Sequence, residues 1–132
     1  MSEPTAGPTP YEILGGHAFF RALVDDFYAG VAADPVLRAL YPEDDLGPAN
    51  ERLRLFLEQY WGGPRTYSDQ RGHPRLRMRH FPFAIDDDAR ARWLRCMRSA
   101  LDNRALPPEL DEPVWRYLET SAQAMVNQPP AS

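Results

Sequence analysis

Apolar residues recur at helical spacing in four stretches of the chain, and no stretch shows the alternating pattern of a half-buried strand. The clearest stripe lies between His17 and Ala33, where it consists of Phe20, Leu23, Val24, Phe27, Tyr28 and Val31. A stripe of this width on one face is typical of a helix that packs against a core. The pattern therefore predicts an all-α fold.

Proline and glycine mark where these helices begin and end. Gly15-Gly16 precedes the first stripe, and Asp34-Pro35 ends it, because the residue before a proline avoids the helical region. We expect a short helix over residues 36–40. A second main helix is expected from Pro48 to Trp61, since Pro48 suits a first turn and Gly62-Gly63-Pro64 stops the pattern.

The second half of the chain contains two further amphipathic stretches. Residues 65–75 have no period and are predicted to be a loop, followed by a short helix over 76–80. Asp86-Asp87-Asp88 opens the third main helix, with carboxylates at the positive end of its dipole. A last helix is expected to begin near Pro113 and to end before Pro129-Pro130. The predicted inward faces are Ala89, Trp93, Cys96, Met97, Ala100 and Leu101, then Val114, Tyr117, Leu118, Ser121, Ala122 and Met125.

The length of 132 residues predicts one domain, with room for one core and one enclosed small ligand. Proline-rich tails are expected over residues 1–10 and 129–132, leaving a domain over 11–128. The net charge of −4 is a poor basis for binding nucleic acid. No apolar run is long enough for stable membrane insertion. A single cysteine and an N-terminus without a signal pattern indicate the cytoplasm.

The familiar catalytic and metal motifs are absent, so attention falls on three histidines. A lone histidine is more often an ordinary surface or core residue than a ligand. His80 is the exception among His17, His73 and His80, because it follows Arg75, Arg77 and Arg79. An inward imidazole with guanidinium groups around it suits a large anionic cofactor bound through a metal. Cys96 and the Asp86–Asp88 run are interpreted as a buried thiol and a helix start.

A second set of residues combines an aromatic ring with a polar tip. Tyr28, Tyr41, Trp61, Tyr67 and Trp93 all lie on or beside elements expected to face the core. Several converging O–H and N–H donors would suit a polar ligand inside an apolar pocket. The alternative is that each donor finds a backbone carbonyl, in which case the residues only build the core.

The order of these residues resembles a known family. The matching blocks are Phe27-Tyr28, Tyr41-Pro42-Glu43-Asp44, the run from Phe56 to Pro64 (FLEQYWGGP), the run from His73 to His80 (HPRLRMRH), and Trp93-Leu94. Together they resemble the group II truncated haemoglobins, the bacterial type often called HbO. The resemblance covers residues 11–128, and its blocks are long, ordered and specific.

The resemblance implies a globin-like two-over-two helical sandwich around one haem b, with His80 as the proximal iron ligand. It places Tyr28, Tyr41 and Trp93 against a bound diatomic ligand, with Ala49 and Leu53 beside them. Its further implied cofactor contacts are Phe56, Arg52, Tyr67, Arg77, Arg79 and Met78.

The function implied is reversible binding of dioxygen, as a carrier or store, with CO and NO as other ligands. One alternative is a haem enzyme, with peroxidase-like or nitric oxide dioxygenase activity that depends on an external reductase. A second is a cofactor-free helical interaction module. The family includes homodimers, and the sequence leaves monomer and homodimer open.

Overall fold

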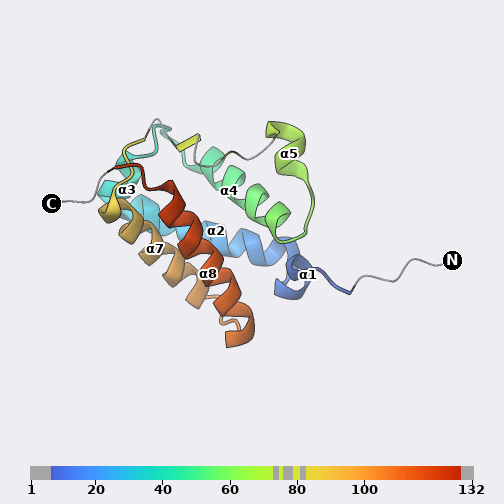
Figure 1. The fold of residues 1–132 in the computed structure, drawn as a ribbon. Helices are drawn as coiled ribbons and strands as arrows, with labels where there is room; N and C mark the ends of the chain where they lie inside the picture. Colours follow the sequence, from blue (N-terminus) through green and yellow to red (C-terminus); the bar gives the residue numbers. More distant parts are fainter. Residues whose placement is uncertain (1–6, 73–74, 76–78, 81–82, 129–132) are drawn as a thin grey trace.

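The computed structural model describes residues 7–72, 75, 79–80 and 83–128, and every regular element within these ranges is helical. The described residues form seven helices in chain order (Figure 1): α1 (Pro10–Leu14), α2 (Gly16–Ala33), α3 (Pro35–Ala39), α4 (Gly47–Tyr60), α5 (Thr66–Arg71), α7 (Asp87–Asp102) and α8 (Pro108–Met125). The all-α prediction is confirmed. None of the described helices is long and apolar enough to cross a membrane.

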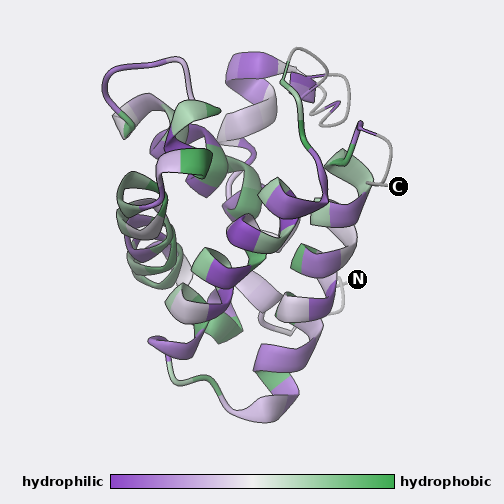
Figure 2. Cartoon of the chain, turned by 90° about the vertical axis from the view of Figure 1, so that its left-hand side faces the viewer, coloured by the Kyte–Doolittle hydropathy of each residue, from purple (hydrophilic) through white to green (hydrophobic). Residues whose placement is uncertain are grey.

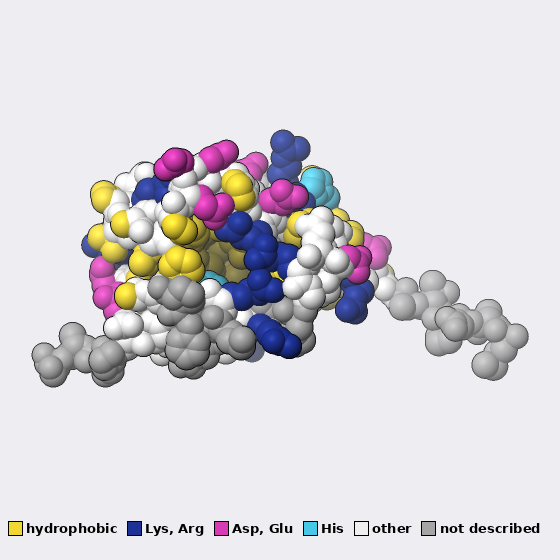
Figure 3. All heavy atoms as spheres, turned by 90° about the horizontal axis from the view of Figure 1, so that it is seen from above, with side chains coloured by type: hydrophobic (Ala, Val, Ile, Leu, Met, Phe, Trp, Pro, Cys, Tyr) yellow, Lys and Arg dark blue, Asp and Glu magenta, His cyan; other side chains and the backbone are white. Residues whose placement is uncertain are grey.

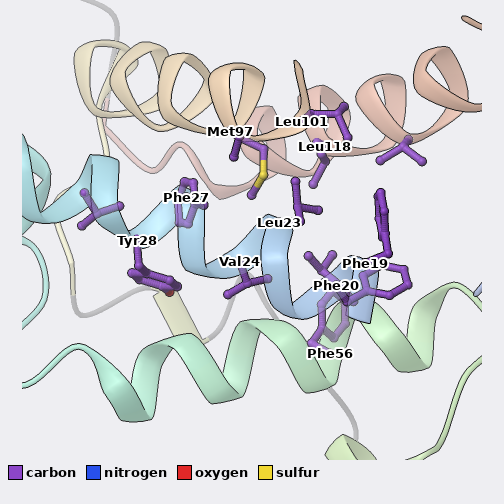
Figure 4. Packing of buried hydrophobic residues seen from close by; sticks show 14 of the residues in the cluster. Phe19, Phe20, Leu23, Val24, Phe27, Tyr28, Phe56, Met97, Leu101 and Leu118 are labelled. Carbon is purple, nitrogen blue, oxygen red and sulfur yellow. The ribbon is translucent and has the colours of Figure 1, made fainter. Parts of the chain in front are cut away.

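The long helices pack as two pairs around a shared core. α2 contacts both α4 and α7, and α7 contacts α8, so that α2 lies between α4 on one side and α7 with α8 on the other (Figure 4). Phe20, Leu23, Phe27, Met97 and Leu101 fill the interior and are 1% exposed or less. This arrangement is the two-over-two sandwich expected from the resemblance.

The hydropathy of each helix agrees with this packing. Figure 2 shows hydrophobic and hydrophilic segments alternating along the main helices, as expected of helices with one buried face. Burying one large apolar side chain contributes roughly 1.5–3 kcal/mol relative to leaving it in water. The predicted stripe on α2 is buried throughout its length, which explains why this helix lies at the centre of the fold.

Acidic residues cap two helices: Asp86, where the sequence predicts a helix start, and Asp34, which the sequence predicts only as the end of the preceding helix. Asp34 accepts hydrogen bonds from the backbone N–H groups of Val36 and Leu37 at 3.0 and 3.2 Å, and Asp86 accepts one from Ala89 at 2.8 Å. These bonds satisfy amides that have no partner in a first helical turn. Asp34 also pairs with Arg92 of α7 at 3.1 Å. The start of α3 is thereby tied to the α7 surface.

Helix α1 lies partly in the segment predicted to be a tail. The side chain of Thr9 caps it by accepting from the backbone N–H of Glu12 at 3.2 Å, and Pro10 occupies its first turn. The backbone N–H of Tyr11 donates to the carbonyl of Trp61 at 2.7 Å. The expected tail therefore ends before Thr9, because contacts with the end of α4 order this stretch. Residues 1–6 and 129–132 lie outside the described residues.

The loop predicted over 65–75 is wrong for residues 66–71, which form α5. The side-chain amide of Gln59 donates to the Ser68 hydroxyl at 2.7 Å and accepts from its backbone N–H at 2.9 Å. Tyr67 is 4% exposed and meets Phe56 edge to face, with ring centroids 5.5 Å apart. Tertiary contacts with α4 thus stabilise a helix whose polar sequence has no period. Of the short helix predicted over 76–80, only Arg79 and His80 are described, and both are helical.

The last helix begins at Pro108, five residues before the predicted start, and Pro113 lies inside it. Pro108 suits a first turn, and the single hydrogen bond lost at Pro113 is outweighed by contacts of the extension. The two terminal nitrogens of the Arg98 guanidinium group both donate to the carboxylate of Asp111, at 3.0 and 2.5 Å. This pair holds the first turns of α8 against α7.

Candidate functional site

A cavity of about 410 Å³ lies among α2, α4, α7 and α8, within the size range of small-ligand sites. Most of its wall is apolar. Figure 3 looks into the hollow, where hydrophobic side chains form the lining and basic side chains gather along one edge. Its apolar members include Leu37, Leu40, Leu53, Phe56, Leu57, Phe83, Ile85, Leu118, Ala122 and Met125.

The structure brings nearly all of the predicted site residues to this one cavity. Those that line it are Tyr28, Tyr41, Ala49, Arg52, Leu53, Phe56, Tyr67, Arg79, His80 and Trp93. Arg77 and Met78 lie outside the described residues. Because these residues come from separate parts of the chain, their convergence is a property of the fold rather than of one motif.

Three aromatic donors form a connected group on the cavity wall. The rings of Tyr28 and Tyr41 meet edge to face, with centroids 5.7 Å apart. Trp93 lies close enough to the Tyr41 hydroxyl to lower the pKa of that phenol, and the Tyr28 hydroxyl lies 3.3 Å from the carbonyl of Ala49. Tyr28 has one proton, so it serves either that carbonyl or the Tyr41 oxygen. The Tyr41 side chain lines the cavity, so its hydroxyl proton is within reach of a ligand there.

Both phenols remain protonated under ordinary conditions. Burial is the main cause that raises the pKa of Tyr28, and the neighbouring Tyr41 adds to it. Burial also raises the pKa of Tyr41, although hydrogen bonds from Tyr28 and Trp93 partly oppose the shift. Desolvation disfavours the charged phenolate. The two residues are therefore neutral O–H donors.

Arg38, which the sequence reasoning missed, holds the segment that carries Tyr41. One guanidinium nitrogen donates to the Tyr41 carbonyl at 3.0 Å, and the other donates to the carbonyls of Glu43 and Asp44, both at 2.8 Å. Three carbonyls that point toward one cation fix the backbone of this turn. The available signal was a basic residue in the last turn of α3, a common feature of helix ends.

Asn127 plays a similar part for the segment that carries His80. Its side-chain amide donates to the carbonyls of Phe83 and His80 at 2.8 and 3.2 Å, and its oxygen accepts from the backbone N–H of Ile85 at 2.9 Å. His80 is partly buried and lines the cavity. No local pattern marks Asn127, because its partners are more than forty residues away in the chain.

Basic residues lie along the edge of the cavity. Arg52 pairs with Glu43 at 2.5 Å, and Arg79 donates to the carbonyl of Arg71 at 2.9 Å. Arg90 also lines the cavity, and its buried Nε lies 3.9 Å from the Asp87 carboxylate but has no hydrogen-bond partner among the described residues. A buried guanidinium N–H without an acceptor is costly. A carboxylate of a bound ligand would supply that acceptor.

Two further candidates from the sequence, His17 and Cys96, are not among the residues that line the cavity. His17 is mostly exposed, and its Nδ1 lies within hydrogen-bond distance, 3.0 Å, of the Glu58 carboxylate. Cys96, predicted to be a buried thiol, is only half-buried, and it lies against Gly30. His73 is outside the described residues.

Comparison with known proteins agrees with this site. The chain matches the family model of bacterial-like globins over residues 9–127. It is 42% identical to the group 2 truncated haemoglobin YjbI of Bacillus subtilis over 90% of this chain and 89% of that protein. A thermostable haemoglobin of the actinobacterium Thermobifida fusca superimposes with a TM-score of 0.91 at 63% identity, covering 92% of this chain and 99% of that one. A truncated oxygen-avid haemoglobin of Bacillus subtilis gives 0.85 at 41%, covering 91% and 100%.

The chain therefore belongs to the bacterial-like globins. Within that family its place is among the group 2 truncated haemoglobins, as the similarity to YjbI and the shared fold show. Membership implies a haem as the cofactor. The cavity fits such a group in three respects: its walls are apolar, His80 lies on its lining, and the orphaned Nε of Arg90 suits a propionate.

Proposed function

We propose that the chain binds dioxygen, together with other diatomic gases such as CO and NO, at a haem b in this cavity. The proposed category is an oxygen carrier or store. One observation carries the proposal: an imidazole and three proton donors from distant parts of the chain line one apolar cavity. The oxygen-avid character stated for the Bacillus subtilis structure supports the same function.

His80 is the proposed iron ligand, through a neutral Nε2. Its Nδ1–H would then donate to a carbonyl, which orients the ring and strengthens the imidazole as a ligand. The haem supplies the iron that binds a diatomic gas reversibly. Arg79, Arg77, Arg52 and Tyr67 are proposed to hold the propionates, and the orphaned Nε of Arg90 adds a further candidate.

On the ligand side, Tyr41, Tyr28 and Trp93 are proposed to donate hydrogen bonds to the gas. Donors fixed in an apolar cavity stabilise negative charge that develops on a bound ligand. Leu53 and Phe56 exclude water from the same wall, and Met78 is a further proposed contact. Ala49 has only a methyl group, so it cannot hold the ligand and leaves a gap beside it.

The donor group also favours a second candidate, a haem enzyme. Three donors predict slow release of oxygen, and slow release suits consumption of the bound ligand better than its delivery. Such an enzyme would carry out peroxidase-like chemistry or nitric oxide dioxygenation with electrons from an external reductase. Measuring nitric oxide consumption with and without a reductase distinguishes the candidates, since only the enzyme sustains turnover.

Haem binding itself is tested by titrating the apo-protein with haemin and following the Soret band. We expect a saturable site with one haem per chain, and reversible oxygen binding after reduction. Failure of the Soret band to shift on addition of protein would contradict the proposal. A cytoplasmic location is part of the proposal, because a lone cysteine suits a reducing compartment.

A further inference from the structure

An ion pair lies at the edge of the cavity, between the turn that carries Tyr41 and helix α4. A guanidinium nitrogen of Arg52 donates to the Glu43 carboxylate at 2.5 Å, and both residues line the cavity. Their side chains are 38% and 32% exposed, so each extends from the cavity lining to solvent. The pair therefore lies on the boundary between the cavity and water.

Both partners are held by the backbone around them. Glu43 lies in the turn whose carbonyl groups accept from Arg38, and its own carbonyl is one of them, at 2.8 Å. Arg52 lies on α4 one helical turn after Ala49 and on the same face. The ion pair thus joins two elements that are separate in the chain. It does so next to Ala49, whose small side chain leaves a gap in the wall.

Arg52 also lies near the proposed ligand donors. Its charge is close enough to Tyr28 to oppose the rise in the pKa of that phenol, and the Tyr28 hydroxyl lies 3.3 Å from the Ala49 carbonyl. The hydrogen bond with Glu43 is the main cause that raises the pKa of Arg52. A guanidinium has five N–H donors, so Arg52 can serve Glu43 and a haem propionate at the same time.

We propose that Glu43 is a positioning residue for ligand exchange, which holds Arg52 across the opening beside Ala49. A diatomic ligand then enters and leaves when the ion pair separates, and we call this pair the Glu43–Arg52 gate. The inference rests on the proposed binding of a gas at a haem in the cavity. It gives a role to Glu43, which the sequence marks only as part of a family motif.

A gate and a contact to the ligand have different kinetic effects. A gate is a barrier on the path, so its removal accelerates association and dissociation by the same factor and leaves the equilibrium constant unchanged. Removal of a donor that touches the bound ligand accelerates dissociation alone. Salt weakens a partly exposed ion pair, because counterions screen its charges. The Glu43–Arg52 gate should therefore open more often at high ionic strength.

The test uses haem-loaded protein and measures carbon monoxide association by flash photolysis and its dissociation by replacement with nitric oxide. Glu43→Gln keeps the length of the side chain but removes the charge that holds Arg52. We expect both rates to rise by about two- to fivefold, the range that a partly exposed ion pair allows. The equilibrium constant should not change. Salt should accelerate both rates in the wild type and have little further effect in Glu43→Gln.

Two further variants test whether the pair acts as a unit. Glu51→Gln is the matched control, because Glu51 is exposed on the same helix and is not among the residues that line the cavity. It should keep both wild-type rates. Arg52→Gln should accelerate both rates as Glu43→Gln does. The double variant should be no faster than either single variant, since each substitution alone already removes the ion pair.

Haem loss to an acceptor protein separates the gate from the proposed function. Glu43→Gln should lose haem at the wild-type rate, because Arg52 keeps its donors for a propionate. A wild type that forms no carbon monoxide complex would contradict the proposed function. With a normal complex, unchanged association in Glu43→Gln, faster dissociation alone, or equal acceleration in Glu51→Gln would overturn the inference. Wild-type rates that do not respond to salt would also overturn it, and that measurement needs no substitution.

Discussion

Trp93 on α7 lies close enough to the phenol of Tyr41, in the turn after α3, to lower the pKa of that phenol. The same phenol meets the Tyr28 ring edge to face. Tyr41 is thus flanked by residues of two helices, α2 and α7, and its hydroxyl lies on the cavity lining. Trp93 is also held by Phe27, with ring centroids 5.0 Å apart. Small changes in this group should therefore alter ligand release more than they alter the fold.

Replacing Trp93 with Phe should accelerate oxygen release. The variant keeps an aromatic ring on the cavity lining but removes the N–H that can donate to a ligand. A hydrogen bond worth about 1 kcal/mol in the bound state changes the escape rate by about fivefold. Stopped-flow measurement of oxygen dissociation provides the check, with Trp61→Phe, away from the cavity lining, as the control. An unchanged rate in Trp93→Phe would show that the indole is not a donor.

Arg38→Leu should loosen the turn that carries Tyr41. Three carbonyls lose their cationic donor, and the cost to the free energy of unfolding is about 2 kcal/mol. Oxygen dissociation should also become faster, because Tyr41 is then less well oriented. Arg21→Leu is the matched control, since Arg21 is exposed and lies at the long distance of 3.9 Å from the Asp25 carboxylate. Faster oxygen release in Arg21→Leu, or an unchanged rate of release in Arg38→Leu, would argue against this role of Arg38.

Asn127→Asp should weaken the side of the cavity formed by the His80 segment. The variant keeps the oxygen that accepts from Ile85 but replaces the amide that donates to the carbonyls of Phe83 and His80. We expect faster loss of haem to an acceptor protein and a lower melting temperature of the haem-loaded form. Gln123→Ala, an exposed change on α8, is the control. Equal haem loss in both variants would contradict the prediction.

Asp34 predicts a specific acid dependence of stability. Burial tends to raise its pKa, but hydrogen bonds from Leu37 and Arg92 outweigh burial and hold the pKa below its ordinary value. The stabilising contribution is therefore complete above about pH 4, the unfolded pKa, and is lost as the pH falls through the lower folded value. Asp34→Asn keeps the helix cap and removes the charge.

This variant should be less stable than the wild type at pH 7, and the difference should shrink toward pH 3. Urea unfolding at the two pH values measures it, with Asp69→Asn on the exposed side of α5 as the control. A difference that stays constant with pH would mean that the charge of Asp34 contributes nothing.

The sequence predicted the elements whose information is local. The apolar stripe of α2, the Asp34-Pro35 boundary and the Asp86 cap all act within a few residues, and they appear where expected. Helix α5 was missed because its stability comes from Gln59 and Phe56, which belong to another helix. The start of α8 was placed too late because its first turns are held by Arg98 of α7.

The residues of the candidate site also fall into two kinds: those that a sequence motif marks, and those whose role depends on contacts made only in the fold. Tyr41 and Trp93 could be assigned because family motifs mark them, and both line the cavity. Arg38 and Asn127 could not, since each acts through backbone carbonyls and no residue pattern records which carbonyls the fold brings near. Tyr117 was placed on the inward face of the last helix, but its contact with the cavity depends on how α8 packs.

The most direct test of the account is an absorption spectrum of the haem-loaded protein, reduced with dithionite and then exposed to carbon monoxide, for wild type and His80→Ala. The account predicts a sharp Soret shift with carbon monoxide in the wild type. It predicts that His80→Ala loses the ferrous spectrum of a histidine-ligated haem. An identical ferrous spectrum in the variant, or no Soret band in the wild type after haem is supplied, would contradict it.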